Sequence, residues 1–184
     1  AALCHLVERA AELGVDPTRV SVGGESAGAN LATVVALAAR DRSGPPLVFQ
    51  WLDVPATDLT MSQPSVREFG EGYLLTRADM EAYIENYLQG HDPEDPMASP
   101  LFAADLSGVP PAVVMTAGLD PLRDEGEAYA ERLREAGVEV ETHRLDGLVH
   151  ASFAFTRLLP EAREYQQTAV RSLRRAYDAA AAAR

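Results

Sequence analysis

The sequence Gly-Glu-Ser-Ala-Gly at residues 24–28 constrains the fold more than any other feature of the chain. It follows an apolar, strand-like run at residues 19–22 and precedes an alanine-rich run with helical spacing at residues 30–40. A strand that turns sharply into a helix strains the backbone of the turn residue, and its side chain then projects free of both elements. We therefore predict that Ser26 is a nucleophile held at such an elbow.

Small residues around Ser26 support this interpretation. A Cβ at Gly24 or Gly28 is expected to collide with the neighbouring strand or helix in so tight a turn. The backbone N–H of Ala27 lies at the start of the predicted helix, where partial positive charge collects, and it faces the same space as the Ser26 hydroxyl. We predict that this N–H is one donor of an oxyanion hole. Glu25 is expected to be buried, to pair with an arginine and to have a structural role.

The composition indicates one acidic globular domain. The 184 residues are 47% hydrophobic and 24% charged, which allows a packed core. The formal net charge is -12, and all 16 basic residues are arginine. Such a surface argues against nucleic acid or anionic membranes as partners. The sequence has no run of about eighteen apolar residues, so we expect no stable membrane insertion. Because no signal sequence is visible, we expect a cytoplasmic protein.

Cysteine and histidine placement argues against a disulfide and against a metal site. Cys4 is the single cysteine, and it lies on the apolar side of a helical pattern, so we expect it to be buried. No Cys/His/Asp group has zinc-like spacing, and a Gly-rich phosphate loop that requires lysine is impossible here. We predict neither a metal nor a cofactor.

The remainder of the chain alternates between strand and helix patterns, which predicts parallel strands joined by right-handed crossovers. Buried strands are expected at 47–52 and 112–117, and an edge strand with one wet face at 138–145. Helices are expected at 1–13, 77–88, 122–136 and from 151 to the end, with a fresh start at Pro160. The long irregular stretch from 54 to 75 is expected to form part of the wall of a site, and the aromatic side chains of this region are expected in the core.

Polar residues follow three of the predicted strands, in the order Ser26, Asp120 and His150. Ligands of an open parallel sheet bind beyond the carboxyl ends of the strands, so these side chains should converge. A serine becomes a good nucleophile when an imidazole removes its proton, and a carboxylate fixes the tautomer of the imidazole and stabilises its cation. We therefore predict Ser26 as nucleophile, His150 as base and Asp120 as its partner, in the chain order of the α/β-hydrolases.

Other histidines and aspartates are weaker candidates. His143 lies within a strand pattern, and His91 lies in a loop rich in proline and aspartate that is expected to face solvent. Asp124 suits a charge at a helix N-terminus. Asp120 is preferred over Asp124 and Asp146 because it stands at a strand end and is followed by a proline, which stiffens the turn.

With these residues identified, the sequence resembles the hormone-sensitive-lipase-like (bacterial family IV) esterases of the α/β-hydrolase fold. The similar segments extend over nearly the whole chain, at residues 16–20, 24–28, 72–75, 98–101, 120–126 and 147–150. The resemblance implies that Ser26, Asp120 and His150 form a catalytic triad. It also implies a small-molecule ester substrate with a short to medium acyl chain, no cofactor, and a homodimer formed through the last strand, Val138 to Leu145.

The sequence also departs from that family. Family members carry a His-Gly-Gly motif upstream of the nucleophile strand, which completes the oxyanion hole, and N-terminal helices and strands that form a cap and the start of the sheet. The 184 residues contain none of these. We therefore expect residues 1–184 to form one partial domain, the C-terminal half of an α/β-hydrolase fold with about four mainly parallel strands flanked by helices. Efficient activity is expected of a longer chain.

The leading functional interpretation is a serine carboxylesterase that works through an acyl-enzyme intermediate. An amidase or peptidase could use the same three residues, and a non-catalytic ligand-binding hydrolase, or an inactive fragment, is a further alternative. His150 argues against the binding module, because the plant hormone receptors that resemble this family have lost the catalytic histidine.

Overall fold

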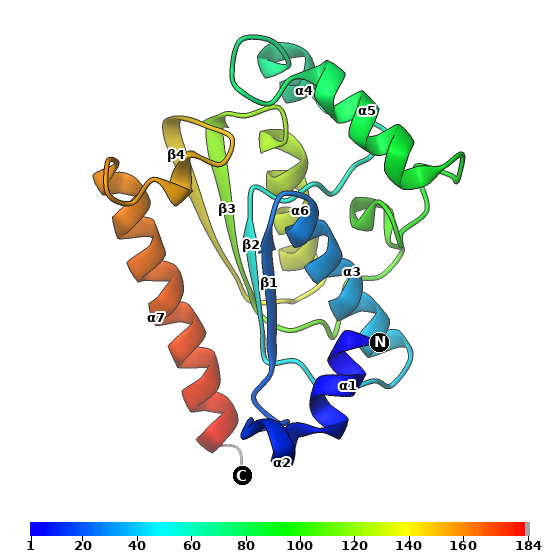
Figure 1. Cartoon of the computed structure of the whole chain (residues 1–184), viewed down its shortest axis with the longest axis vertical. Helices are drawn as coiled ribbons and strands as arrows, with labels where there is room; N and C mark the ends of the chain where they lie inside the picture. Colours follow the sequence, from blue (N-terminus) through cyan, green and yellow to red (C-terminus); the bar gives the residue numbers. More distant parts are fainter. Residues whose placement is uncertain (183–184) are drawn as a thin grey trace.

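The computed structural model describes residues 1–182, which form a parallel sheet covered by helices on both faces (Figure 1). The strands are β1 (Ser21–Glu25), β2 (Phe49–Asp53), β3 (Ala112–Leu119) and β4 (Val140–Val149). They lie side by side in the order β1-β2-β3-β4, and each neighbouring pair is parallel. The predicted α/β-hydrolase arrangement of about four mainly parallel strands flanked by helices is confirmed.

The helices cover the two faces of the sheet and extend past both of its ends. Their bounds are α1 (Ala2–Glu8), α2 (Ala10–Leu13), α3 (Ala27–Asp41), α4 (Pro64–Phe69), α5 (Arg77–Leu88), α6 (Arg123–Glu135) and α7 (Pro160–Ala182), with 3₁₀ turns η1 (Pro100–Phe102) and η2 (Ser152–Ala154). Figure 1 shows α3 and α6 on one side of the sheet, α7 on the other, and α4 and α5 beyond the carboxyl ends of the strands. Within residues 1–182, no helix has both the length and the apolar character that crossing a bilayer requires.

Two apolar clusters fix the sheet between its helix layers. On one face, Val114 of β3 packs in a cluster with Leu52 and with Leu133 of α6. On the other face, Val113 packs in a cluster with Tyr165 of α7. Successive residues of β3 therefore serve opposite faces, and Val113 and Val114 are both buried, as expected of a strand in the middle of a covered parallel sheet.

The N-terminal helix differs from its prediction. It breaks at Arg9, whose φ of -106° and ψ of 18° are not helical, and its second part ends at Gly14 in the left-handed conformation. Cys4 is exposed, so the expectation that it is buried is wrong. Helix α1 has no buried residue: Leu3, Leu6 and Val7 are partly buried, and Cys4 lies on the exposed side.

Strand β4 is an edge strand, as predicted, but it extends beyond residue 145 to Val149. Its pairing with β3 shifts register between Ala117 and Leu119, and Gly147 adopts a φ of 76° that favours glycine. This irregularity lets the strand bend and resume pairing opposite Leu119. Residues 146–149, which lie beyond the predicted end of this strand, are therefore part of it. Dimerisation through this edge stays a prediction.

Candidate active site

The turn at Ser26 has the strained backbone that the sequence predicts. Ser26 lies directly after β1 and directly before α3, with a φ of 53° and a ψ of -119°. A positive φ is uncommon for a residue with a side chain and costs conformational energy. The surrounding backbone holds it in place: the Ser26 N–H donates to the carbonyl of Asp53 at 2.8 Å, and its carbonyl accepts from the N–H of Asn30 at 3.0 Å.

The two glycines of the turn have different importance. A Cβ placed on Gly24 would lie 2.5 Å from the carbonyl carbon of Gly28 and 2.9 Å from the N of Ala29, so only glycine allows β1 and α3 to approach this closely. A Cβ on Gly28 would meet no described atom within 4 Å. The expectation that both positions exclude a side chain is therefore wrong for Gly28, because its missing Cβ points into open space and not toward the strand.

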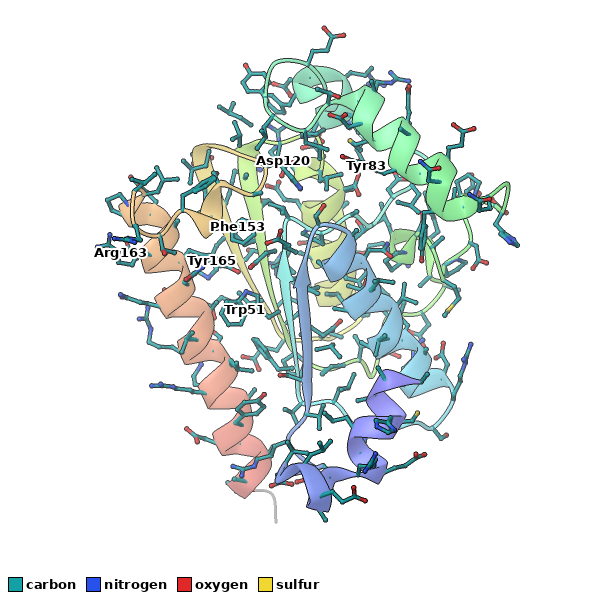
Figure 2. The ribbon with its side chains drawn as sticks, in the orientation of Figure 1. Trp51, Tyr83, Asp120, Phe153, Arg163 and Tyr165 are labelled. Carbon is teal, nitrogen blue, oxygen red and sulfur yellow. The ribbon has the colours of Figure 1, made fainter. Side chains whose placement is uncertain are left out.

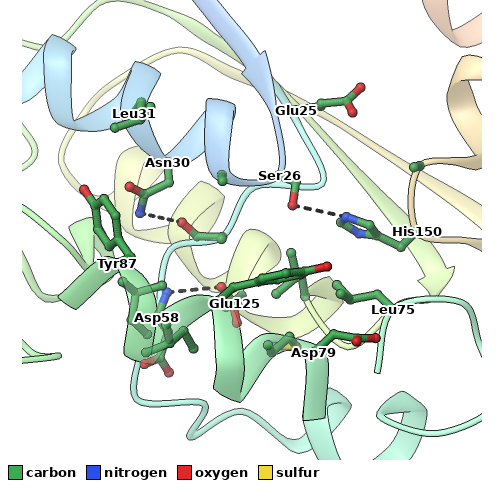
Figure 3. A pocket seen from close by; sticks show the side chains of 18 of the residues that line it. Glu25, Ser26, Asn30, Leu31, Asp58, Leu75, Asp79, Tyr87, Glu125 and His150 are labelled. Atoms are coloured by element: carbon green, nitrogen blue, oxygen red, sulfur yellow. Dashed lines mark hydrogen bonds between the residues drawn. The ribbon is translucent and has the colours of Figure 1, made fainter. Parts of the chain in front are cut away.

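The three side chains chosen from the sequence meet at one end of the sheet. Ser26, Asp120 and His150 are the first residues after β1, β3 and β4, respectively. The His150 Nε2 lies 3.1 Å from the Ser26 Oγ, an interaction drawn in Figure 3, and its Nδ1 lies 2.8 Å from the Asp120 Oδ2. Because the carboxylate can only accept, Nδ1 carries the proton and Nε2 is left to accept the serine hydroxyl.

The three side chains differ in their exposure to solvent, from the buried Asp120 to the partly exposed Ser26. The Asp120 carboxyl is completely buried, and its Oδ1 accepts the backbone N–H of Leu122 at 2.9 Å, so both of its oxygens have donors. His150 is 9% exposed, and Ser26 is partly exposed at the surface of a pocket. A fully bonded buried carboxylate holds the imidazole in one orientation.

The backbone N–H of Ala27 is available beside Ser26. Ala27 is the first residue of α3 and lines the same pocket. The first N–H groups of an α-helix have no partner within the helix, and the helix dipole makes them favourable for a developing negative charge. Its role in an oxyanion hole stays a prediction.

A cavity of about 550 Å³ opens at Ser26 and His150. Its wall includes Ala56, Asp58 and Leu59 from the segment after β2, and Leu74 and Leu75 before α5, which agrees with the prediction that residues 54–75 line a site. Further apolar lining comes from Leu31 of α3 and from α5, with Met80, Tyr83, Ile84 and Tyr87.

The two tyrosines of α5 contradict the expectation that the aromatic side chains of this region are core residues. Tyr83 is 65% exposed and Tyr87 is 53% exposed, and both line the cavity. Figure 3 shows Tyr87 at its edge. The sequence pattern could not distinguish them from core residues, because a helix that covers a pocket has the same apolar spacing as one that covers a core.

Glu125 is a functional candidate that the sequence did not reveal. This residue of α6 lines the cavity, yet its side chain is completely buried. Its Oε1 accepts the N–H groups of Thr57 at 2.6 Å and Asp58 at 3.1 Å, and its Oε2 has no hydrogen-bond partner among residues 1–182. Burial raises the pKa of the Glu125 carboxyl well above its usual range, although the two N–H donors oppose this shift.

Asp53 is a second buried acid, on the opposite face of the sheet. The last residue of β2, it is 8% exposed, and its Oδ1 accepts the Trp51 Nε1–H at 2.9 Å and the hydroxyl of Tyr165. Figure 2 shows Trp51 and Tyr165 between the sheet and α7. Burial raises the pKa of Asp53 to about 6, the two hydrogen bonds lower it, and the negative charge of Glu25 adds to the increase.

The other candidates lie where they cannot join Ser26. Glu25 is exposed, so the expectation that it is buried is wrong, and none of the ion pairs among residues 1–182 includes it. His143 bonds to Glu141 on β4, and His91 is exposed. Asp124 accepts the N–H of Ser65 at 2.9 Å in the first turn of α6. Over residues 1–182, no cluster of three or more histidine, cysteine, aspartate or glutamate side chains could hold a metal ion.

Comparisons with known proteins agree with this architecture. Residues 1–154 match a family described as alpha/beta hydrolase fold. The carboxylesterase NlhH of Mycobacterium tuberculosis is 44% identical over 183 residues, which cover 97% of this chain and 57% of NlhH. The carboxylic ester hydrolase LipN of the same organism is 49% identical over 145 residues, which cover 76% of this chain and 39% of LipN.

Solved structures give the same result. The crystal structure of EstE1, a thermostable carboxylesterase from a metagenomic library, is 40% identical with a TM-score of 0.88 and covers 96% of this chain. The matched region is 61% of the EstE1 chain. The chain thus spans only part of its relatives' length: the matched regions are 39% of LipN and 57% of NlhH.

Proposed function

Because this chain belongs to the alpha/beta hydrolase fold family, as its resemblance to the hormone-sensitive-lipase-like esterases predicted, we propose that it carries the catalytic triad of a serine carboxylesterase. The observation that carries the proposal is the continuous hydrogen-bonded series from the Ser26 Oγ through His150 to the buried Asp120. Nucleophile, base and orienting carboxylate have the mutual geometry that acyl transfer requires.

In this proposal, the Ser26 Oγ attacks the carbonyl carbon of the ester while its proton moves to the His150 Nε2. The negative charge on the carbonyl oxygen is stabilised by the N–H of Ala27. The bond to the alcohol oxygen then breaks, and the alcohol takes the proton from His150, which leaves an acyl group on Ser26. Water repeats the sequence: its proton goes to His150, its oxygen attacks the acyl carbon, and Ser26 recovers its proton as the acid leaves.

The cavity supports an ester with a short to medium acyl chain. Its volume of about 550 Å³ lies within the range of roughly 300 to 1,000 Å³ that is typical of small-molecule sites. Leu31, Tyr83 and Ile84 provide apolar surface for the hydrocarbon parts of such a substrate, and Ser26 and His150 lie at its edge. The lining includes no lysine or arginine, so nothing in the described wall selects for an anionic substrate.

A fluorophosphonate probe tests the proposal, because its phosphorus reacts with a serine that a neighbouring imidazole activates. We expect one equivalent of label on Ser26 of the folded chain and none on Ser26→Ala. The control Ser43→Ala removes an exposed serine just past the opposite end of α3 from Ser26 and should label like the unmodified protein. Because efficient activity is expected of a longer chain, the deciding measurement uses the full-length protein: a folded full-length protein that takes no label at Ser26 would contradict the esterase proposal and favour a non-catalytic binding module.

A further inference from the structure

Glu125 connects two parts of the molecule that carry the proposed triad. Glu125 lies in the first turn of α6, shortly after Asp120. Its carboxyl accepts hydrogen bonds from the segment that follows β2. The attachment is double, because the Thr57 Oγ1 also donates to the backbone carbonyl of Glu125 at 2.9 Å. Thr57, Asp58 and Glu125 all have 1% exposure or less, so these bonds form away from solvent.

The segment held by Glu125 also contacts the nucleophile turn. The N–H of Ala56 points to the carbonyl of Ser26 at 3.4 Å, and the Asn30 Nδ2 donates to the carbonyl of Ala56 at 2.8 Å. The same Asn30 amide donates to the carbonyl of Ala98 at 2.7 Å. A side chain on α6 therefore fixes a pocket wall that in turn touches the residue that carries the nucleophile.

The surroundings of Glu125 favour its neutral form. The charged groups that act on it are Asp58, in the segment after β2, and Asp120, at the end of β3, and both are negative. Its Oε1 has two donors, whereas its Oε2 has none among the described residues. An ionised carboxylate would leave charge on a buried oxygen without a donor, which is costly, and a protonated one would not. Burial accordingly raises its pKa well above the ordinary range of a glutamate.

We propose that Glu125 is a positioning residue: its carboxyl, kept protonated, ties the Thr57–Asp58 peptide to α6 and so holds the pocket wall against Ser26 and Asp120. The proposal rests on the proposed esterase function only for its rate measurements. When the pH rises far enough to ionise the carboxyl, a further negative charge appears near Asp58 and Asp120, and the wall must open to hydrate Oε2. The reaction at Ser26 then slows.

The protonation state is tested first, by a measurement that needs no catalysis. With glutamate labelled by ¹³C at the carboxyl carbon, the Glu125 resonance is the one that Glu125→Gln removes. We expect its pKa to lie well above the ordinary glutamate value of about 4.3, because burial disfavours the charged form. A Glu125 resonance that titrates with the exposed glutamates would overturn the proposal, whether or not the chain labels with phosphonate.

The positioning role is tested by the rate of phosphonate labelling at Ser26. Glu125→Gln keeps the acceptor for both N–H groups without a charge, so it should label within about threefold of the unmodified chain at neutral pH and should lack the decline as the pH rises. Glu125→Leu removes the acceptor and should label at least about 30-fold more slowly. Glu131→Gln, on an exposed position of the same helix, is the matched control and should retain this decline.

The two proposals fail in different ways. If Glu125 titrates well above the ordinary glutamate range but the unmodified protein takes no label, the esterase proposal fails and the protonated carboxyl stands. If Ser26 labels normally in Glu125→Leu, or if Glu125→Gln declines with rising pH like the unmodified chain, the positioning role is wrong and the esterase proposal stands. If Glu125→Leu does not fold, Glu125→Gln and the ¹³C titration still decide the outcome.

Discussion

Asp120 and Asp53 are buried carboxyls at the ends of neighbouring strands, yet they belong to different parts of the molecule. Asp120 bonds to His150 beside the cavity, whereas Asp53 bonds to Trp51 and Tyr165 under α7. Both are almost inaccessible to solvent, at 0% and 8% exposure. The two acids are therefore similarly buried and similarly close to a strand end, but they bond to different partners.

The last paired residue of each strand explains the difference. Asp53 is still within β2 and pairs with Met115 of β3, so the alternation of the sheet directs its side chain to the same face as Trp51, two residues earlier. Asp120 is one residue beyond the end of β3, where alternation no longer applies. The Asp120 carboxyl can therefore turn toward His150 beside the cavity, whereas alternation directs the Asp53 carboxyl toward Trp51 and Tyr165.

The largest expected effect comes from Asp120→Asn. An amide at this position can donate to His150, which favours the wrong tautomer, and comparable changes in serine hydrolases lower kcat by about 10⁴. The measurement is the rate of ester hydrolysis or of phosphonate labelling at Ser26. The control is Asp53→Asn at neutral pH, which should stay within about threefold because the Asp53 side chain bonds to Trp51 and Tyr165 and only its backbone carbonyl, which the substitution keeps, bonds to Ser26. Equal losses in the two variants would remove the distinction between the two acids.

A smaller effect is expected from Gly24→Ala, which tests whether the turn itself fixes Ser26. The new Cβ would clash with the backbone of Gly28 and Ala29, so we expect a loss of about 3 kcal/mol in the free energy of unfolding. Gly28→Ala is the matched control, because its Cβ meets open space and alanine favours the helix by roughly 0.5 to 1 kcal/mol. Urea denaturation measures both, and similar destabilisation by the two variants would contradict the assignment.

The smallest effect is a pH dependence at Asp53. Its folded pKa of about 6 lies above the ordinary 3.8, so the fold binds this proton more tightly than the unfolded chain does. The resulting stability is complete below about pH 4 and is lost as the pH rises through about 6. Relative to the unmodified chain, Asp53→Asn should therefore gain about 2 kcal/mol between about pH 4 and pH 8, measured by urea denaturation. Asp146→Asn, at an exposed position, should show no such change.

Ser26, Asp120 and His150 could be predicted from the sequence because each directly follows a strand, and a strand end can be recognised from the neighbouring residues alone. Apolar runs mark where such strands end. The four-stranded parallel sheet could be predicted for the same reason, since its strands pair in the order in which they occur in the sequence.

The remaining features depend on contacts between distant segments. Glu125 has the sequence pattern of an ordinary acid in the first turn of a helix, and only the fold buries it against residues 57 and 58. Tyr83 has core-like spacing but lies along a cavity, and Gly28 is in a tight turn without needing to be a glycine. Neither periodicity nor motif spacing describes which side of an element another segment covers.

The chain order of the sheet also has a consequence for biosynthesis. As this stretch leaves the ribosome, β1 emerges first, and each later strand can dock on the one before it without displacing an existing neighbour. Ser26 therefore waits for its base, because His150 is translated 124 residues later, at the end of the outermost strand. A nascent chain that stops before β4 would have the turn at Ser26 but not His150, so the proposed reaction requires that β4 has been made and has docked on β3.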